Sequence, residues 1–210
     1  MSVMTPCERL CLPGRRIAVE TRDDGAATLT GYAAVFYRKD DPGTEYRIFD
    51  DLIERIEPGA FRRALAENQD IRALFNHDAS AVLGRVPETL RLDEDEIGLR
   101  YAIVLPPTQL GRDVAALVAR GDITGSSFSF AVRSQRYDYL DGVAIRWLTD
   151  VDLYDVGPVT FPAYDATNAA VRAEADRLKA ECLADWDRRR RAAAAAKSAV
   201  EAIARCAREC

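Results

Sequence analysis

Three kinds of residue in this sequence could together carry out nucleophilic or acid–base chemistry: a histidine, a group of serines and a pair of aspartates. The chain has one histidine, His77, so any reaction that uses an imidazole must use this one. It follows a short apolar run within Asn-His-Asp, which predicts a strand end or a loop, where binding and catalytic groups often lie. A surface histidine without a chemical role is the alternative interpretation.

The serines lie in Gly-Ser-Ser-Phe-Ser-Phe, residues 125–130, which is typical of a β-strand. Because side chains alternate along a strand, Ser127 and Ser129 share one face, and Ser126 shares the other with the two phenylalanines. We expect the aromatic face to pack into the core, so that Ser127 is presented from a rigid element as a candidate nucleophile. Serines that simply cover the polar face of a half-buried strand are the alternative.

The aspartates lie on a strand predicted over residues 151–159. By alternation, Asp155 shares a face with two apolar side chains, whereas Asp152 lies on the opposite face. A carboxylate among apolar side chains needs a partner, and a histidine so partnered is held in the tautomer that base catalysis requires. A salt bridge to an arginine, such as Arg133 or Arg146, is the alternative.

A serine, a histidine and a carboxylate form a set in which the imidazole activates the hydroxyl as a nucleophile. The set predicted here is His77, Ser127 and Asp155, with Asp152 as the alternate acid. The order along the chain is not diagnostic, because such triads occur in several orders on unrelated folds.

The elements that must position these residues are mainly strands, so the predicted fold class is α+β with mainly antiparallel strands. Alternation and β-branched or aromatic content predict strands or short apolar runs, and apolar residues at helical spacing predict two helices in the body. The turn signal Asp141–Gly142 predicts a hairpin. The expected strands are 27–37, 46–56, 98–105, 124–132, 134–139, 143–148 and 151–159, the short runs 70–75, 81–86 and 89–92, and the helices about 58–68 and 110–120.

The predicted organisation is a loose leader over residues 1–20, one domain over 21–166 and a basic helical tail over 167–210. The tail reads as two helical pieces with a joint at residues 188–196. An apolar stripe along its first piece is typical of helix packing, against a partner helix or against the chain's own body. The stripe residues are Val171, Ala175, Leu178, Cys182 and Trp186.

Charge is distributed unevenly along the chain. The net charge is −5; residues 167–210 hold ten basic and seven acidic residues (+3), and the remainder holds nineteen basic and twenty-seven acidic (−8). An acidic body argues against nucleic acid as the main partner. No apolar run reaches the ~20 residues of a membrane span, and the start shows no secretory signal pattern. We expect a soluble intracellular protein without membrane contact.

The five cysteines lie near the two ends, at Cys7, Cys11, Cys182, Cys206 and Cys210. The predicted body therefore uses no disulfides, as in a reducing compartment. Four thiolates could bind zinc, but structural zinc sites usually have tighter spacing on turns. We expect no metal and no cofactor.

Taken together, several segments resemble the caudovirus prohead serine proteases, the capsid-maturation proteases of tailed phages. The resemblance extends from about Gly31 to Thr167, and the order and spacing of the segments carry it. The matching segments are Gly-Tyr-Ala-Ala-Val-Phe (31–36), Ile-Glu-Pro-Gly-Ala-Phe (56–61), Leu-Phe-Asn-His-Asp (74–78), Leu-Gly-Arg (83–85), Glu-Ile-Gly-Leu (96–99), Gly-Asp-Ile-Thr-Gly-Ser-Ser-Phe-Ser-Phe (121–130), Asp-Val (155–156) and Phe-Pro-Ala-Tyr (161–164).

The resemblance implies a fold similar to herpesvirus assemblins, a mainly antiparallel β-barrel with flanking helices. It also implies that His77 is the general base and Ser127 the nucleophile, with Asp155 where the family usually has an acid. The sequence departs from the family at Gly157–Pro158; because proline cannot donate to a strand ladder, we expect this strand to end early or to lie at an edge. Gly84–Arg85 is a candidate for a supporting element.

Ser126 and Ser129 stand where the family often has Met and Gly. The function implied is a serine endopeptidase that cleaves scaffold or capsid-protein delta segments, and itself, inside an assembling procapsid in the host cytoplasm. The implied partners are the major capsid protein, the scaffold and further copies of the chain, in a phage or a gene transfer agent. Self-cleavage is predicted near residues 167–173 or within 192–196.

Two other functions stay open. One is a capsid-assembly or scaffold-binding module of the same fold, with weak or absent activity. The other is a hydrolase of small esters, against which the lack of a Gly-x-Ser-x-Gly elbow argues.

Overall fold

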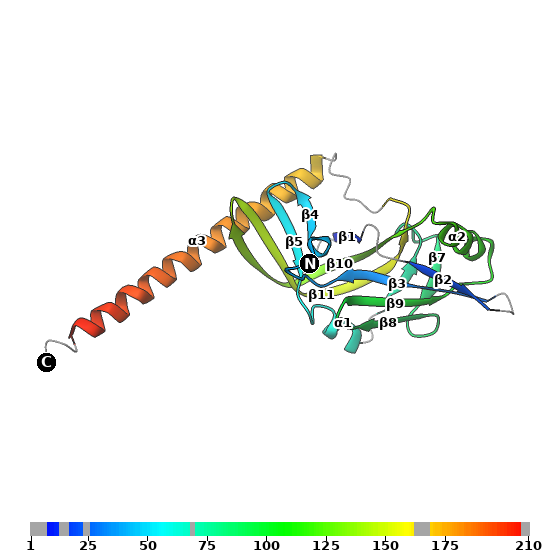
Figure 1. Cartoon of the computed structure of the whole chain (residues 1–210), viewed down its shortest axis with the longest axis horizontal. Coiled ribbons are helices and arrows are strands. Elements are labelled where there is room, and N and C mark those ends of the chain that lie inside the picture. The colour runs from blue at the N-terminus through cyan, green and yellow to red at the C-terminus, as the bar shows by residue number, and fades with distance from the viewer. Residues whose placement is uncertain (1–7, 13–16, 23–25, 68–69, 162–168, 207–210) are drawn as a thin grey trace, which may run out of the picture. The chain divides into compact units, whose positions relative to one another are not determined.

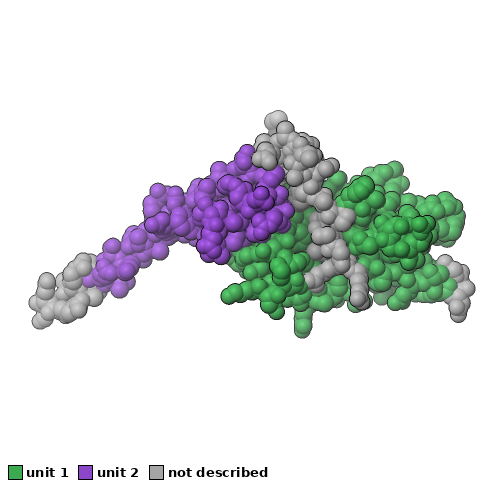
Figure 2. Space-filling view, turned by 45° about the horizontal axis from the view of Figure 1, so that its top comes forward, with its two compact units in different colours: residues 1–46, 54–136, 147–165 green, residues 47–53, 137–146, 166–210 purple. Residues whose placement is uncertain are grey.

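The computed structural model describes residues 8–12, 17–22, 26–67, 70–161 and 169–206. It divides into two compact units (Figure 2): unit 1 comprises residues 1–46, 54–136 and 147–165, and unit 2 comprises 47–53, 137–146 and 166–210. The strands are β1 (Glu8–Leu12), β2 (Ala18–Thr21), β3 (Ala27–Val35), β4 (Tyr46–Phe49), β5 (Leu52–Ile56), β6 (Arg72–Leu74), β7 (Val82–Arg85), β8 (Leu90–Glu94), β9 (Gly98–Val104), β10 (Gly125–Leu140) and β11 (Val143–Val159).

These strands form two sheets (Figure 1). The larger has the order β1-β10-β11-β5-β4, with β6 paired to β11 and to β7, and the smaller has the order β2-β3-β9-β8. Pairing is mostly antiparallel, although β6 runs parallel to β11. The predicted α+β class is confirmed. The barrel is not confirmed, because no closed barrel is seen among the described strands.

The hairpin β10–β11 carries two of the predicted site residues. Its turn has positive φ at Asp141 (52°) and Gly142 (85°), the backbone of a type I′ turn that suits the twist of adjoining strands. This turn was expected, but the segmentation was wrong: residues 125–140 and 143–159 are each one continuous strand. After Gly125, β10 contains no proline or glycine. β11 contains both Gly157 and Pro158 and continues through them.

A row of phenylalanine rings packs beneath the first half of β10. Phe36 stacks on Phe61 at 6.1 Å between ring centroids, Phe61 meets Phe128 edge-on at 5.5 Å, and Phe128 stacks on Phe130 at 4.8 Å. Both β10 phenylalanines are fully buried, which confirms the predicted core face. Aromatic burial of this kind fixes the strand, and with it the serines on its opposite face.

The helices differ from the prediction in length. α1 (Arg62–Ala66) is shorter than the expected 58–68, while α2 (Gln109–Arg120) begins at the N-cap Thr108 and ends at Gly121, as expected. α3 (Ala169–Cys206) is one continuous helix. The predicted joint at 188–196 is wrong, because arginine and alanine are both strong helix formers. None of the described helices is long and apolar enough to cross a membrane.

Within unit 2, the first part of α3 packs on the tip of the hairpin. The Tyr137 hydroxyl donates to Glu181 at 2.8 Å, Cys182 Sγ donates to the Asp138 carbonyl at 2.9 Å, and Trp186 packs against Tyr139. The stripe residues Ala175, Leu178 and Cys182 are buried there, whereas Val171 has no described side chain. Residues 187–201 are exposed.

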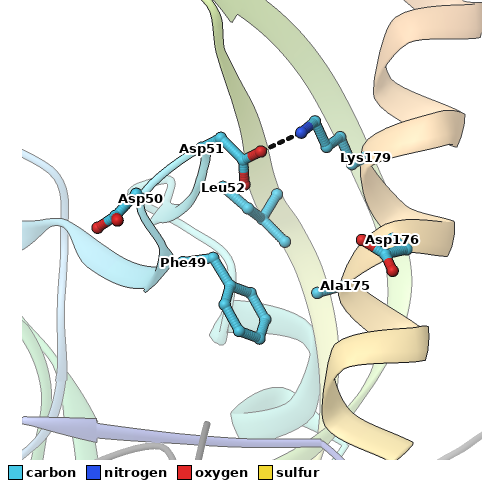
Figure 3. Close-up of a pocket in the computed structure, with 7 residues that line it drawn as sticks. All are labelled: Phe49, Asp50, Asp51, Leu52, Ala175, Asp176 and Lys179. Carbon is cyan, nitrogen blue, oxygen red and sulfur yellow. Dashed lines mark hydrogen bonds and ion pairs between the residues drawn. The ribbon is translucent and has the colours of Figure 1, made fainter. Parts of the chain in front are cut away.

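Unit 2 also contains a hollow of about 230 Å³, and Figure 3 shows the residues that line it. Its walls hold an ion pair between Lys179 and Asp51, and none of the predicted site residues lines it. The lining residues are Phe49, Asp50, Asp51, Leu52, Ala175, Asp176 and Lys179.

The pairing of β6 with β11 depends on Gly157. A Cβ at this position would lie 2.0 Å from the Leu74 carbonyl oxygen, so any side chain would push the two strands apart. The expectation that Gly157–Pro158 ends the strand early is therefore wrong. β11 continues to Val159, and Pro158, which cannot donate, instead accepts a hydrogen bond from the Asn76 amide at 3.1 Å.

We predict that Gly157→Ala lowers the free energy of unfolding by about 2–3 kcal/mol, because the methyl group cannot fit between the strands. Urea denaturation followed by tryptophan fluorescence measures this. Gly121→Ala is the matched control: nothing lies within 4 Å of its Cβ position, so it should cost about 1 kcal/mol from its left-handed backbone alone. Equal effects of the two changes would contradict the steric explanation.

Candidate active site

His77 lies in the turn that joins β6 to β7. Asn76 and His77 have φ of 55° and 57°, so two consecutive residues occupy the left-handed region, which Asn and His tolerate better than most residues. Asp78 N–H donates to the Phe75 carbonyl at 3.1 Å, and Ser80 N–H donates to the Asp78 side chain at 2.8 Å. This compact turn aims the imidazole back across the sheet.

Asn76 fastens the turn to the end of β11. Its Oδ1 accepts from the Thr160 backbone N–H at 2.8 Å, and its Nδ2 donates to Thr160 Oγ1 at 3.1 Å. The backbone N–H of Asn76 also donates to the Pro158 carbonyl. Asn76 therefore pairs with Pro158 and Thr160 much as a neighbouring strand would. The turn and the strand are thus held in one register.

The three predicted site residues come together. His77 Nε2 lies 2.6 Å from Ser127 Oγ, and His77 Nδ1 lies 2.5 Å from Asp155 Oδ1. The side chains of His77 and Asp155 are 7% and 11% exposed, and Ser127 is fully buried. The imidazole therefore bridges a hydroxyl and a carboxylate in a site largely shielded from water.

The second carboxylate oxygen of Asp155 also has a partner. Ser129, two residues beyond Ser127 and 1% exposed, donates its hydroxyl to Asp155 Oδ2. Asp155 itself faces inward, as alternation predicted, and lies opposite Arg72 in the parallel register of β6 and β11.

Asp152 lies on the other face of β11 and contacts arginines. Its Oδ1 accepts from Arg63 at 2.7 Å, and its Oδ2 accepts from Arg133. Arg63 also bonds Asp150, and these acceptors raise the pKa of its guanidinium above the usual value. The structure therefore brings Asp155, and not the alternate Asp152, to the histidine.

Strand β1, within the predicted leader, lies beside the candidate nucleophile. It pairs antiparallel with β10, with Cys11 opposite Ser127. The Ser127 hydroxyl donates to the Leu10 carbonyl at 2.8 Å, and Leu10 is fully buried. A hydroxyl has one proton, so a proton given to Leu10 is not given to His77 Nε2.

Ser126 serves the opposite face of β10. Its hydroxyl lies 2.8 Å from that of the buried Tyr101, and burial raises the pKa of Tyr101. Gly31 leaves the room this ring needs, since a Cβ there would lie 2.7 Å from the Tyr101 oxygen. The extra serines thus have separate partners.

Sequence reasoning missed Asn76, Ser129 and Leu10 as parts of the site. Asn-His-Asp was the available signal for Asn76, and the shared face with Ser127 was the signal for Ser129. No local signal marks Leu10, because its carbonyl belongs to the backbone. Arg85 pairs with Asp70 at 2.6 Å, and a supporting role for Gly84–Arg85 stays a prediction.

The residues that could hold a metal are only partly described. Cys7 and Cys210 lie outside the described residues, and Cys182 is buried in unit 2 against the Asp138 carbonyl. Among the residues that the structure covers, no group of three or more His, Cys, Asp or Glu is arranged to bind a metal. The chemistry available at His77 is proton transfer to and from the Ser127 hydroxyl.

Comparison with known proteins gives the family. A model of the caudovirus prohead serine protease family matches residues 15–180. No curated protein matches. Among solved structures, the chain is similar to the bacteriophage T4 capsid assembly protease, gp21, with 13% identity, 73% of this chain and 96% of that chain covered, and a TM-score of 0.45. The chain belongs to the caudovirus prohead serine protease family.

Proposed function

We propose that this chain is a serine endopeptidase that cleaves scaffold or capsid-protein segments, and itself, during prohead assembly. The observation that carries the proposal is the imidazole of the chain's single histidine, which bridges Ser127 Oγ and Asp155 Oδ1 at 2.6 and 2.5 Å. Family membership supports peptide bonds as the substrate class.

The proposed reaction is acyl transfer in two steps. Ser127 Oγ attacks the carbonyl carbon of the scissile peptide while its proton moves to His77 Nε2, and Asp155 stabilises the imidazolium through Nδ1. His77 then gives that proton to the leaving amine, and the C–N bond breaks to leave an acyl-serine ester. Water hydrolyses the ester by the same proton path in reverse, which releases the new carboxyl end and restores the serine.

Substrate access in this proposal requires that β1 move. In the conformation described, Ser127 has no exposed surface and Leu10 accepts a hydrogen bond from its hydroxyl. If β1 moved away from β10, the Ser127 proton would become available to His77, and the edge of β10 would be open to a peptide. An edge strand without a bulky cover is a surface on which an extended peptide can pair.

The partners we propose are the major capsid protein, the scaffold and further copies of this chain, inside an assembling procapsid of a phage or a gene transfer agent. Self-cleavage remains proposed near residues 167–173. Residues 192–196 lie within α3, where helical hydrogen bonds hold the backbone away from the extended form that proteases cleave, so cleavage there requires the helix to open.

A second candidate is a capsid-assembly module of the same fold with little activity. The burial of Ser127 beneath β1 favours it, because a nucleophile that is never uncovered performs no chemistry. The two functions differ in whether Ser127 becomes reactive.

We predict that Ser127→Ala lowers cleavage of the cognate capsid protein, and of the chain itself, on the order of 10³-fold or more, because the residue supplies the attacking oxygen. Intact-mass spectrometry after incubation at neutral pH measures both. Ser126→Ala is the matched control: it removes a buried hydroxyl from the same strand but from the opposite face, and it should keep most of the activity. Full-length masses in the wild type, with capsid protein present, would favour the assembly module, and cleavage of a fluorogenic ester alone would favour the small-ester hydrolase.

We also predict that deleting residues 1–12 speeds the labelling of Ser127 by a fluorophosphonate at least about tenfold, since a local opening free energy of 1.4 kcal/mol already corresponds to that factor. Labelling is measured by mass spectrometry, and the deletion combined with Ser127→Ala should not label.

Arg9→Ala serves as the control for this deletion. The Arg9 side chain is exposed, and its loss leaves the Leu10 carbonyl in place, so labelling should match the full-length rate. Equal rates in the deletion variant and the full-length chain would show that β1 does not limit access.

A further inference from the structure

The carboxylate of Asp155 receives a hydrogen-bond donor on each oxygen. His77 Nδ1 lies 2.5 Å from Oδ1, and the Ser129 hydroxyl donates to Oδ2. As whole residues, Asp155 and Ser129 are both buried. A carboxyl group this far from water relies on protein donors for its hydrogen bonds.

The strand geometry makes this second contact specific. Ser127 and Ser129 lie two residues apart on β10, so both face the same side, and β11 with Asp155 is the neighbouring strand. One strand therefore holds both the hydroxyl that meets the imidazole and the hydroxyl that meets the carboxylate. The hydrogen bonds run from Ser127 through His77 and Asp155 to Ser129. A shift of β10 would therefore move Ser127 and Ser129 together.

We infer that Ser129 is a positioning residue for the proposed hydrolysis: its hydroxyl fixes the plane of the Asp155 carboxylate so that Oδ1 faces His77 Nδ1. The inference rests on the proposed function for its effect on turnover. Its effect on the imidazole does not depend on turnover. The sequence had singled out Ser129 only as an extra hydroxyl beside the nucleophile, where the resembled family often has glycine.

The direction of the effect follows from charge. The Ser129 donor offsets part of the negative charge on Asp155, so without it the carboxylate stabilises the imidazolium more strongly and the pKa of His77 rises. The acid limb of the pH–activity profile, below which His77 is protonated and cannot act as a base, then moves to higher pH.

Other charged groups near this carboxylate are already paired or exposed. On β6, the register partner Arg72 is bonded to Asp70. On β1, Arg9 lies opposite Ser129 in register and is exposed. On the opposite face of β11, Asp152 is bonded to Arg63 and Arg133.

The single histidine allows a direct test by NMR of protein labelled with ¹⁵N-histidine. In Ser129→Ala we expect the pKa of His77 to rise by about half a unit to one unit. We also expect kcat/KM at neutral pH to fall about tenfold. The acid limb of the pH–activity profile should move to higher pH by as much as the pKa of His77 rises. Ser126→Ala is the control, because its hydroxyl contacts Tyr101 on the other face, and it should titrate as the wild type does.

A titration of His77 in Ser129→Ala identical to that of the wild type would overturn the inference. Ser129→Cys, which fills the same space with a weaker donor, should shift the titration in the same direction by less, and it gives the answer if the alanine variant does not fold. If the wild type proves inactive, the proposed function fails, yet the titration still decides the role of Ser129.

Discussion

The site depends on one constraint: a carboxyl group held inside a β-sheet must find its hydrogen-bond donors within the protein. Asp155 meets this requirement with His77 on one oxygen and Ser129 on the other. Burial of an unpaired carboxylate would cost several kcal/mol, so the turn that carries His77 and the strand that carries Ser129 both help to stabilise this part of the fold. The contacts used by the proposed chemistry therefore also contribute to stability.

The neighbouring features serve that register. Gly157 lets β6 approach β11 closely enough for parallel pairing, and Asn76 fastens the turn after β6 to the residue that follows β11. The phenylalanine rings behind β10 hold the serine face in position. Each contact is small by itself, but together they fix three elements that are distant in sequence. A network of this kind is cooperative, so the loss of one member loosens the others.

Alternation along strands made much of this site predictable. It separated Ser127 from Ser126 and Asp155 from Asp152, and His77 joined the set because it is the chain's single histidine. Other features depend on atoms that local patterns do not reveal. Gly157–Pro158 predicted an early strand end from the proline alone, because the role of Gly157 is set by a carbonyl oxygen at Leu74. β1 was predicted as a loose leader because its partner strand is more than one hundred residues away. The joint predicted at residues 188–196 was wrong for a local reason. The low-complexity runs of arginine and alanine there were taken to interrupt the helix, although both residues favour a continuous one.

The position of Leu10 shows how a rigid site can also be closed. The contacts of His77 with Ser127 and Asp155 are already formed, so the proposed reaction needs no rearrangement of the imidazole and carboxylate. The feature that opposes the proposed reaction is the Leu10 carbonyl, which accepts a hydrogen bond from the hydroxyl of Ser127, the candidate nucleophile. A carbonyl in this place differs from a substrate, because it accepts the proton through oxygen and does not offer its carbon for attack. Because β1 stands at the end of the strand order and pairs with β10, its proposed separation would leave the β10–β11 pairing between Ser127 and Asp155 intact. In the proposed mechanism, access to Ser127 is therefore set at the sheet edge, whereas the contacts among His77, Ser127 and Asp155 lie in the sheet interior.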